Sequence, residues 1–334
     1  MPNALPPRRD LLGPPLLMLG LPRSGTTWSA RLVASAEGCR PVMEPDNEKT
    51  SAPAIGAKRA VGRFPVLAPG EDQPAYRRLW AWALAGAPRS PMLHVADAML
   101  RDTPEGELES LLSGRRSPRM AVSELLARKL PATVMTALDA RLVVKSVHAC
   151  LAAEWLAHEF AVEVIVVRRH PAGVLASWLE LGLPDADRGL DRHLAVRARY
   201  VEPWGLPGPG AGRLSRAAWH IGLLSSALED ALARNPHWHV VEHEALCLEP
   251  QVRLGALFDG LGLAWSKGTE RLLADNDRPG SGFALQRRRS EVPGSWRTRL
   301  DGPELAELTR TLDGFPHQQW WRTQDPIPPA PVRR

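Results

Sequence analysis

Short apolar runs alternate with helical segments along this chain, and this alternation constrains the fold more than any other feature. Strand-like runs occur at 16–20, 141–146, 162–167 and 237–241. Helical segments occur at 26–36, 105–112, 117–130, 152–160, 171–181, 214–234, 248–261 and 303–312. Buried strands that alternate with helices are typical of βαβ units, in which helices cover both faces of a parallel sheet. The sequence therefore predicts an α/β fold of three layers, with a central parallel sheet flanked by helices.

Length and composition agree with one large domain. Of the 334 residues, 44% are hydrophobic and 24% are charged, which excludes disordered, collagen-like and coiled-coil chains. The proline-rich ends predict a flexible arm over residues 1–15 and a tail over 325–334. Between them we expect a single domain over 16–324, enlarged by insertions at 46–130 and 182–212.

The cysteines and the apolar N-terminal stretch bear on location. Cys39, Cys150 and Cys247 are odd in number and widely spaced, so they indicate neither a disulfide framework nor a metal site. We therefore expect no metal and a reducing, cytoplasmic location. The apolar stretch 11–21 is about half of a membrane span and contains two prolines. Neither a transmembrane segment nor a signal peptide is expected.

The charge of the chain points to an anionic ligand. The formal net charge is +5, and arginine accounts for the excess. A guanidinium group binds phosphate or carboxylate with two parallel hydrogen bonds. Net charge by itself leaves nucleic acid, a membrane surface and a small anion open as partners.

A glycine-containing loop at 20–27 (GLPRSGTT) joins the first strand-like run to the first helix. Its two glycines have the separation found in a P-loop, and backbone N–H groups at such a helix start cradle anions. A nucleotide kinase or ATPase has Lys after the second glycine, where this chain has Thr26. The loop carries its cation at Arg23 instead. These residues predict a P-loop-like anion site without the kinase lysine.

The segment 22–28 (PRSGTTW) resembles the 5′-phosphosulfate-binding loop of sulfotransferases that use 3′-phosphoadenosine 5′-phosphosulfate (PAPS), and it is closer to the bacterial and Golgi branch of that family. The resemblance implies a P-loop-like fold, PAPS as co-substrate and a reaction that needs no metal. It assigns donor binding to Arg23, Ser24, Gly25, Thr26 and Thr27. Trp28 is similar to a Trp that stacks on adenine in the cytosolic enzymes, and a core position suits it equally.

The resemblance also implies a site for the 3′-phosphate of the donor. In the family this site is an Arg in an Arg-x-Pro pattern after a later strand, with a Ser eight residues on. Arg169 and Ser177 match this pattern, whereas Arg168 lacks the spacing to Ser177. An Arg fork and a hydroxyl near a helix N-terminus suit a dianionic phosphate.

A basic segment near the end of the chain resembles the family's segment that closes over the 3′-phosphate. Arg289 precedes GSWR at 294–297, and Arg287 and Arg288 are interchangeable with it as candidates. The alternative is an ordinary basic loop.

Catalytic roles follow from the same resemblance. Glu44 lies at about the distance from Arg23 at which protein-tyrosine and heparan-type sulfotransferases place a glutamate base. Lys145 ends the second strand-like run, matching a Lys that steadies the sulfuryl group, and Arg23 shares that role. His148 is the rival base, because the cytosolic enzymes use a His in a Lys-x-His segment, although here the spacing is one residue longer.

The acceptor is not indicated by the sequence, and neither is the oligomeric state. The resemblance implies transfer of a sulfuryl group to a hydroxyl or amine of a small-molecule, carbohydrate or lipid-linked acceptor, with the two insertions binding it and no role for nucleic acid. A P-loop kinase or NTPase, and a non-catalytic binder of anionic ligands, stay open as alternatives.

Overall fold

The computed structural model describes residues 13–86, 91–101, 103–112, 118–129, 140–182, 198, 211–278, 291–316, 320 and 322. These residues form two compact units. Unit 1 comprises the chain up to Leu19 together with Val33–Ile165, and unit 2 comprises Gly20–Leu32 together with the chain from Val166 onward. The single domain expected over 16–324 stays a prediction.

The strands form one five-stranded sheet in the order β2-β3-β1-β4-β5. Their bounds are β1 Leu16–Leu19, β2 Cys39–Met43, β3 Arg141–Ser146, β4 Glu163–Arg168 and β5 His239–Glu242. β3 runs parallel to both β1 and β2, and Lys145 lies opposite Met18 on one side and Met43 on the other. Every residue of β1 and β3 is buried, as expected of strands inside a parallel sheet. The predicted α/β fold with a mostly parallel central sheet flanked by helices is confirmed.

Strand β2 was not predicted from the sequence. It contains Pro41, which cannot donate to a strand ladder, and its residues are exposed or half-buried. β2 lies at an edge of the sheet, where proline is tolerated because one side of the strand makes no ladder hydrogen bonds. Its outer position therefore explains why the local sequence does not read as a buried strand.

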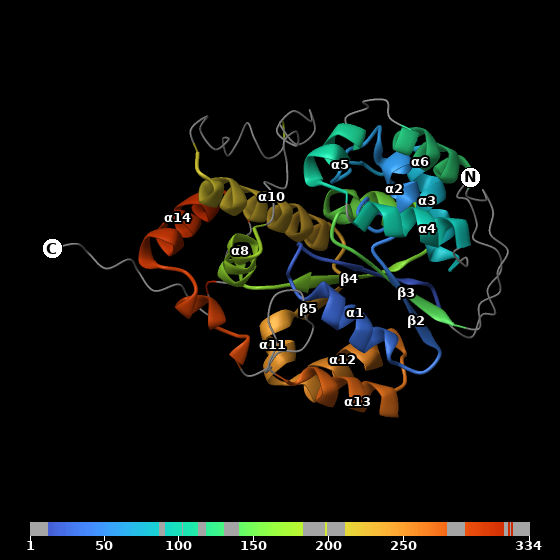
Figure 1. Cartoon of the computed structure of the whole chain (residues 1–334). Helices are drawn as coiled ribbons and strands as arrows, with labels where there is room; N and C mark the ends of the chain where they lie inside the picture. Colours follow the sequence, from blue (N-terminus) through green and yellow to red (C-terminus); the bar gives the residue numbers. More distant parts are fainter. Residues whose placement is uncertain are drawn as a thin grey trace. The chain divides into compact units, whose positions relative to one another are not determined.

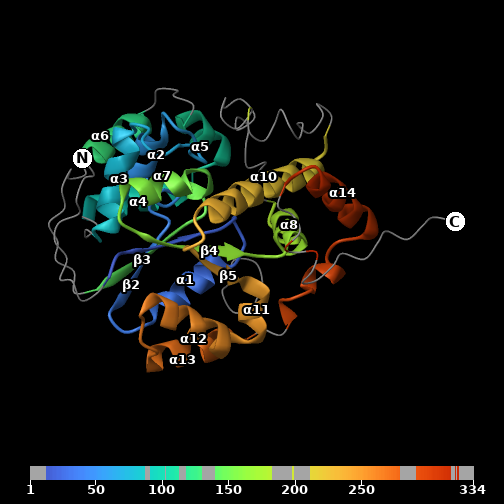
Figure 2. The same cartoon turned by 180° about the vertical axis from the view of Figure 1, so that it is seen from behind.

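The helices of unit 1 include several within the insertion expected at 46–130. Their bounds are α2 Ala52–Lys58, α3 Pro74–Leu84, α4 Pro91–Arg101, α5 Glu105–Leu112, α6 Pro118–Lys129, the short 3₁₀ helix η1 Ala149–Ala152, and α7 Ala153–Glu159. Helix α2 packs against α6 and α3, and these helices lie together in both views (Figures 1 and 2). The stretch that follows β2 thus forms a cluster of helices.

The helices of unit 2 are α8 Pro171–Glu180, α10 Arg213–Arg234, α11 His243–Leu248, α12 Pro250–Leu261, α13 Lys267–Asn276, η5 Ser295–Thr298 and α14 Gly302–Asp313. Helix α10 packs against α14 and α8, and α14 lies beside α10 in both views (Figures 1 and 2). The helix predicted over 248–261 is divided at Pro250, because proline favours the first turn of a new helix. Helix α1, Thr26–Ala34, follows the glycine loop.

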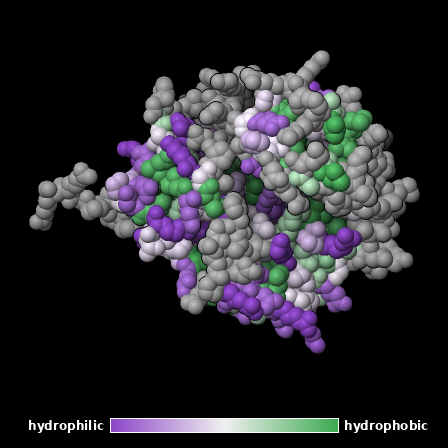
Figure 3. Space-filling model, in the orientation of Figure 1, coloured by the Kyte–Doolittle hydropathy of each residue, from purple (hydrophilic) through white to green (hydrophobic). Residues whose placement is uncertain are grey.

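The surface of unit 2 is hydrophilic over α12 and α13, where purple side chains gather in the space-filling view (Figure 3). Lys267, Glu270 and Arg271 are among the exposed charged residues there. Within the part of the chain that the structure describes, no helix combines the length and the apolar character needed to cross a bilayer.

Candidate functional site

The glycine loop between β1 and α1 has a backbone that only certain residues can adopt. Arg23 has φ 69° and Gly25 has φ 88°, both in the left-handed region. Gly20 is required for space, because a Cβ there would lie 2.7 Å from the Ser24 hydroxyl and 2.8 Å from the Val167 carbonyl oxygen. The loop is therefore a tightly folded turn that presents its backbone rather than its side chains.

The start of α1 leaves N–H groups open to an anion. The first intrahelical hydrogen bond runs from Ser29 N–H to Gly25 C=O at 3.0 Å. The N–H groups of Thr26, Thr27 and Trp28 therefore precede the helical ladder and have no intrahelical acceptor. Such groups, with the positive end of the helix dipole, form an anion-binding position.

Residues 169–178 of the β4–α8 segment bind the glycine loop directly. Arg169 Nη1 donates to the Arg23 carbonyl oxygen at 2.6 Å, and Trp178 Nε1 donates to the Pro22 carbonyl oxygen at 2.8 Å. Arg23 Nε in turn donates to the Ser177 hydroxyl at 3.1 Å. Within unit 2 the structure thus brings Arg23, Arg169 and Ser177 together, although they come from two different strand-to-helix turns.

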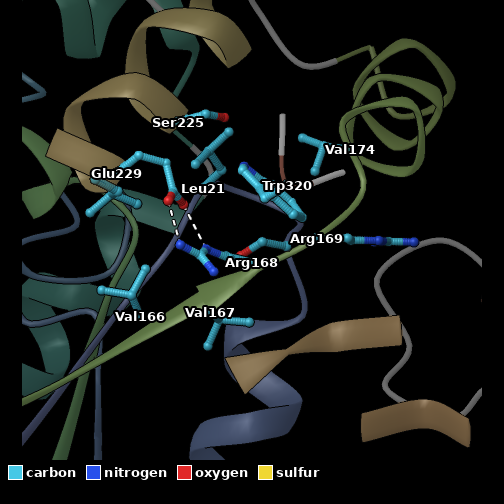
Figure 4. Close-up of a pocket in the computed structure, with 11 residues that line it drawn as sticks. Leu21, Val166, Val167, Arg168, Arg169, Val174, Ser225, Glu229 and Trp320 are labelled. Carbon is cyan, nitrogen blue, oxygen red and sulfur yellow. Dashed lines mark hydrogen bonds and ion pairs between the residues drawn. The ribbon is translucent and has the colours of Figure 1, made fainter. Parts of the chain in front are cut away.

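The two arginines that follow each other in β4 and its loop point to different partners. Arg168 forms a two-pronged ion pair with Glu229 of α10, with its Nε 2.6 Å from Glu229 Oε1, and lies over the Trp320 ring at 5.5 Å. Figure 4 shows that pair as dashed lines in a small pocket, while the Arg169 side chain extends away from the pair. Arg168 is engaged with Glu229, and Arg169 faces the loop.

Arg169 is a half-buried cation with spare hydrogen-bonding capacity at its Nε. Among the described residues its Nε has no hydrogen-bond partner. Burial lowers the pKa of Arg169, as do the neighbouring cations Arg23 and Arg299, with Glu244 acting in the opposite direction. The guanidinium groups of Arg23 and Arg169 repel each other, so an anion placed between them would relieve an unfavourable interaction.

A buried histidine, His243, packs against the same loop. The sequence did not indicate that it belongs to the site. The His243 ring lies where a Cβ of Gly25 would be, with Nδ1 only 2.3 Å from that position, and meets the Trp28 ring edge-on at 5.8 Å. Burial, with Arg169 nearby, holds the pKa of His243 well below its ordinary value, so the ring is neutral. Because His243 follows β5, its approach to Gly25 depends on the tertiary fold, which a local motif does not reveal.

Gly25→Ala is expected to lower the free energy of unfolding by about 2 kcal/mol or more, because the new methyl group would need a positive φ and would overlap His243. Urea denaturation measures this change. Gly255→Ala is the matched control, since that glycine lies inside α12 with open space at its Cβ position, and Ala there should be neutral or stabilising. Equal stability of the two variants would contradict the tight contact at Gly25.

In unit 1, Glu44 and Lys145 form an ion pair at the ends of neighbouring strands. Lys145 Nζ donates to Glu44 Oε1, and Glu44 N–H continues the ladder by donating to the Lys145 carbonyl oxygen at 2.7 Å. The Lys145 side chain is 2% exposed and that of Glu44 is 23% exposed. Glu44 has φ 45°, so the chain turns sharply here and directs the carboxylate back over β3.

The pKa of Glu44 lies below its ordinary value. Burial alone would raise the pKa, but the charge and hydrogen bond of Lys145, with help from His148 and Asn47, outweigh burial. Glu44 is therefore ionised at neutral pH. An ionised carboxylate that remains partly exposed can accept a proton from a bound group.

His148 lies in a different set of contacts. Its Nδ1 is 3.1 Å from Lys58 Nζ, whose other donor bonds go to the Asp46 carbonyl oxygen and Glu48 Oε2, each at 2.9 Å. An ammonium group has three N–H donors, so Nδ1 of His148 takes the third and accepts it. Burial, followed by the charge of Lys58, lowers the pKa of His148, so the ring is neutral and carries its proton on Nε2.

Buried charges behind Glu44 were not predicted. Asp46 and Glu48, which follow Glu44 closely in the chain, are both 1% exposed. Glu48 pairs with Lys58 and Arg63, and its pKa is held far below the ordinary value because these cations outweigh the effect of burial. The positions of the acidic residues in the sequence do not predict the Glu48–Lys58 ion pair, because Lys58 belongs to helix α2, which follows them in the chain.

The remaining predicted positions are only partly described. Arg287, Arg288 and Arg289 lie outside the described residues, as does most of the insertion at 182–212. The segment from residue 291 onward is described as far as 316. In it, Trp296 stacks on His170, the residue after Arg169, with ring centres 4.9 Å apart. Trp28 is buried at the start of α1. Across the described ranges, no group of three or more His, Cys, Asp or Glu side chains is placed to hold a metal ion.

Fold and site define an α/β protein in which a tight glycine turn joins the first strand to the first helix and contacts Arg169 and Ser177. No family model and no curated protein matches the chain. A sulfotransferase domain from the curacin biosynthetic pathway is similar with a TM-score of 0.47 at 14% identity, covering 90% of this chain and 97% of that one. Sulfotransferase STF9 from Mycobacterium avium has a TM-score of 0.40 at 12% identity, covering 91% and 77%. Sulfotransferase STF1 from Mycobacterium tuberculosis H37Rv has a TM-score of 0.40 at 14% identity, covering 86% and 77%. Likenesses this distant say nothing by themselves about activity.

Proposed function

We propose that the protein transfers a sulfuryl group from PAPS to a hydroxyl or amine of an acceptor and releases adenosine 3′,5′-diphosphate. The observation that carries this proposal is the hydrogen-bonded set of Arg23, Arg169 and Ser177 beside the open N-terminus of α1. Two cations, a hydroxyl and free backbone N–H groups suit a ligand with phosphate groups at two positions.

The residues present fit such a donor. Gly25 lets the loop backbone adopt a positive φ at the start of α1, and Arg169 keeps a buried Nε without a partner among the described residues. We assign the 5′-phosphosulfate to Arg23 and the backbone of 24–27, and the 3′-phosphate to Arg169 and Ser177. Trp28 is proposed to contact the adenine, and Arg289 to close over the 3′-phosphate.

The catalytic roles are assigned to the pair in unit 1. Glu44 accepts the proton of the acceptor hydroxyl or amine as the new bond from oxygen or nitrogen to sulfur forms. The bond from sulfur to the bridging oxygen of the 5′-phosphate breaks, and its electron pair leaves with adenosine 3′,5′-diphosphate. Lys145 and Arg23 neutralise charge on the sulfuryl group and on that bridging oxygen, as cations do in phosphoryl transfer.

Glu44 is better suited than His148 to act as the base. The carboxylate of Glu44 is ionised and partly exposed, whereas Nδ1 of His148 accepts from Lys58 and Nε2 carries the proton. A ring in that tautomer donates a hydrogen bond and has no free lone pair to take a proton.

Ligand-induced thermal stabilisation tests the donor assignment. Adenosine 3′,5′-diphosphate at a hundred times its Kd is expected to add about 2.7 kcal/mol to the free energy of unfolding, which raises Tm by a few degrees. Adenosine 5′-monophosphate, which lacks the 3′-phosphate, should stabilise much less, and Ser177→Ala should reduce the difference between the two. Stabilisation by Mg²⁺-ATP but not by adenosine 3′,5′-diphosphate would favour a P-loop kinase or NTPase and contradict the proposal.

A further inference from the structure

A second carboxylate, two residues after Glu44, reaches the end of the neighbouring strand. Asp46 accepts the Ser146 hydroxyl at 2.8 Å on Oδ1 and at 3.0 Å on Oδ2. Ser146 follows Lys145 directly and is 0% exposed. This Asp46–Ser146 contact therefore joins the turn that carries Glu44 to the strand end that carries Lys145.

Other hydrogen bonds hold both partners of the contact in place. The Ser146 oxygen accepts the N–H groups of His148 and Ala149, each at 3.1 Å, and so orders the chain after β3. The Tyr76 hydroxyl donates to Asp46 Oδ2 at 3.2 Å from α3. Lys58 Nζ donates to the backbone carbonyl oxygen of Asp46. The end of β3 and helix α3 thus both donate to the Asp46 carboxylate, and α2 donates to the backbone of the same residue.

Such a buried network is costly to maintain for stability alone. Buried charges lose their hydration, and a well-packed apolar group of similar size often serves stability as well or better. The turn it holds includes Glu44 in a left-handed conformation, which persists only where the surroundings enforce it. The network therefore has a task in fixing this turn.

We propose that Asp46 is a positioning residue, which through Ser146 and Tyr76 holds the Glu44 carboxylate against the Lys145 ammonium group. The inference rests on the proposed function for the roles of Glu44 and Lys145, but its geometry stands on the contacts of unit 1. Positioning of this kind matters because catalytic groups act only within a narrow range of distances.

The electrostatic surroundings of Glu44 make its ionisation a reporter of this contact. Lys145 faces the carboxylate from β3, His148 from the chain after β3, and Asn47 from the same turn. Asp46, Glu48 and Lys58 lie behind them in the buried network. If the turn loosens, Glu44 moves away from Lys145 while its other surroundings keep their charges, and the pKa of Glu44 rises.

The test compares two buried serines. Ser146→Ala removes the contact to Asp46, and Ser51→Ala removes a hydroxyl that is equally buried and has no hydrogen-bond partner among the described residues. The pKa of Glu44 is read by NMR titration of ¹³C-labelled glutamate in the full chain, with the Glu44 signal assigned from Glu44→Gln. Ser146→Ala is expected to raise this pKa, and Ser51→Ala is expected to leave it unchanged.

Turnover gives the second readout. Ser146→Ala should lower kcat about tenfold to a hundredfold with little change in KM for PAPS, whose binding residues lie elsewhere. Tyr76→Phe removes a neutral donor to Asp46 and keeps the ring packing, so it should give a smaller shift in the same direction and serves if Ser146→Ala does not fold. An unchanged pKa of Glu44 in the folded variants would overturn the positioning role. A raised pKa in a protein that transfers no sulfuryl group would uphold the contact and refute the proposed reaction.

Discussion

Glu44→Gln is expected to lower kcat for sulfuryl transfer by about 10³-fold, within the range found when a general base is removed. The amide has the shape of the carboxylate but does not accept the acceptor's proton, and it leaves Lys145 without its anionic partner. Initial rates at saturating PAPS and acceptor measure the effect. Affinity for adenosine 3′,5′-diphosphate should remain close to that of the wild type, because the donor is assigned to Arg23, Arg169 and Ser177.

His148→Gln is the informative comparison for that result. Since Nδ1 of His148 accepts from Lys58, the glutamine carbonyl can take over that hydrogen bond, and we expect a smaller loss of kcat than in Glu44→Gln. The reverse order, with His148→Gln inactive and Glu44→Gln active, would make His148 the base and contradict the assignment.

Lys145→Met is expected to lower kcat by about 10²-fold or more, the scale observed when one charge-stabilising donor is lost. It should also move the acid limb of the profile of kcat against pH. The pKa of Glu44 is held low by Lys145 against the effect of burial, so in the wild type the base stays ionised to a pH below the ordinary glutamate range. Without the cation, burial remains, the pKa rises, and activity is lost at a higher pH.

Lys49→Met removes the same charge at an exposed position in the segment after β2 that also carries Glu44. It should leave both kcat and the acid limb near those of the wild type, because solvent screens an exposed charge. Equal effects of the two methionine variants would show that net charge, rather than the Glu44–Lys145 pair, governs the rate.

The pair also links stability to pH. Because the folded-state pKa of Glu44 lies below the unfolded value, the pair stabilises the fold above the ordinary glutamate pKa. This contribution is lost as the pH falls through the folded-state pKa.

Local sequence patterns were enough to predict four of the five strands and the turn between β1 and α1. Anion binding at that turn stays a prediction. The runs that became β1, β3 and β4 are apolar, whereas the run that became β5 also contains His237 and His239. All four end near polar residues, and in a parallel sheet such ends gather functional groups. β2 was missed because it contains Pro41 and its residues are exposed or half-buried, unlike the fully buried residues of β1 and β3.

Contacts between residues far apart in the chain could not be predicted from the sequence. Asp46 and Ser146 are 100 residues apart, and nothing near Asp46 signals a hydroxyl at the end of β3. The contact between His243 and Gly25 likewise depends on the packing of the residues after β5 against the glycine loop. The spacing to Ser177 favoured Arg169 over Arg168 as the candidate for the 3′-phosphate. The ion pair of Arg168 with Glu229 is a separate physical reason to prefer Arg169.

Transfer of label from PAPS carrying radioactive sulfur in its sulfuryl group tests the central claim most directly. The protein would be incubated with the labelled donor and a panel of phenols, sugars, lipid-linked glycans and amines, and both the labelled product and adenosine 3′,5′-diphosphate would be quantified. The wild type is expected to form labelled product and adenosine 3′,5′-diphosphate in equal amounts with at least one acceptor. Glu44→Gln is expected to form neither product at a comparable rate. Failure of the wild type to bind PAPS, or consumption of Mg²⁺-ATP in its place, would contradict the central claim.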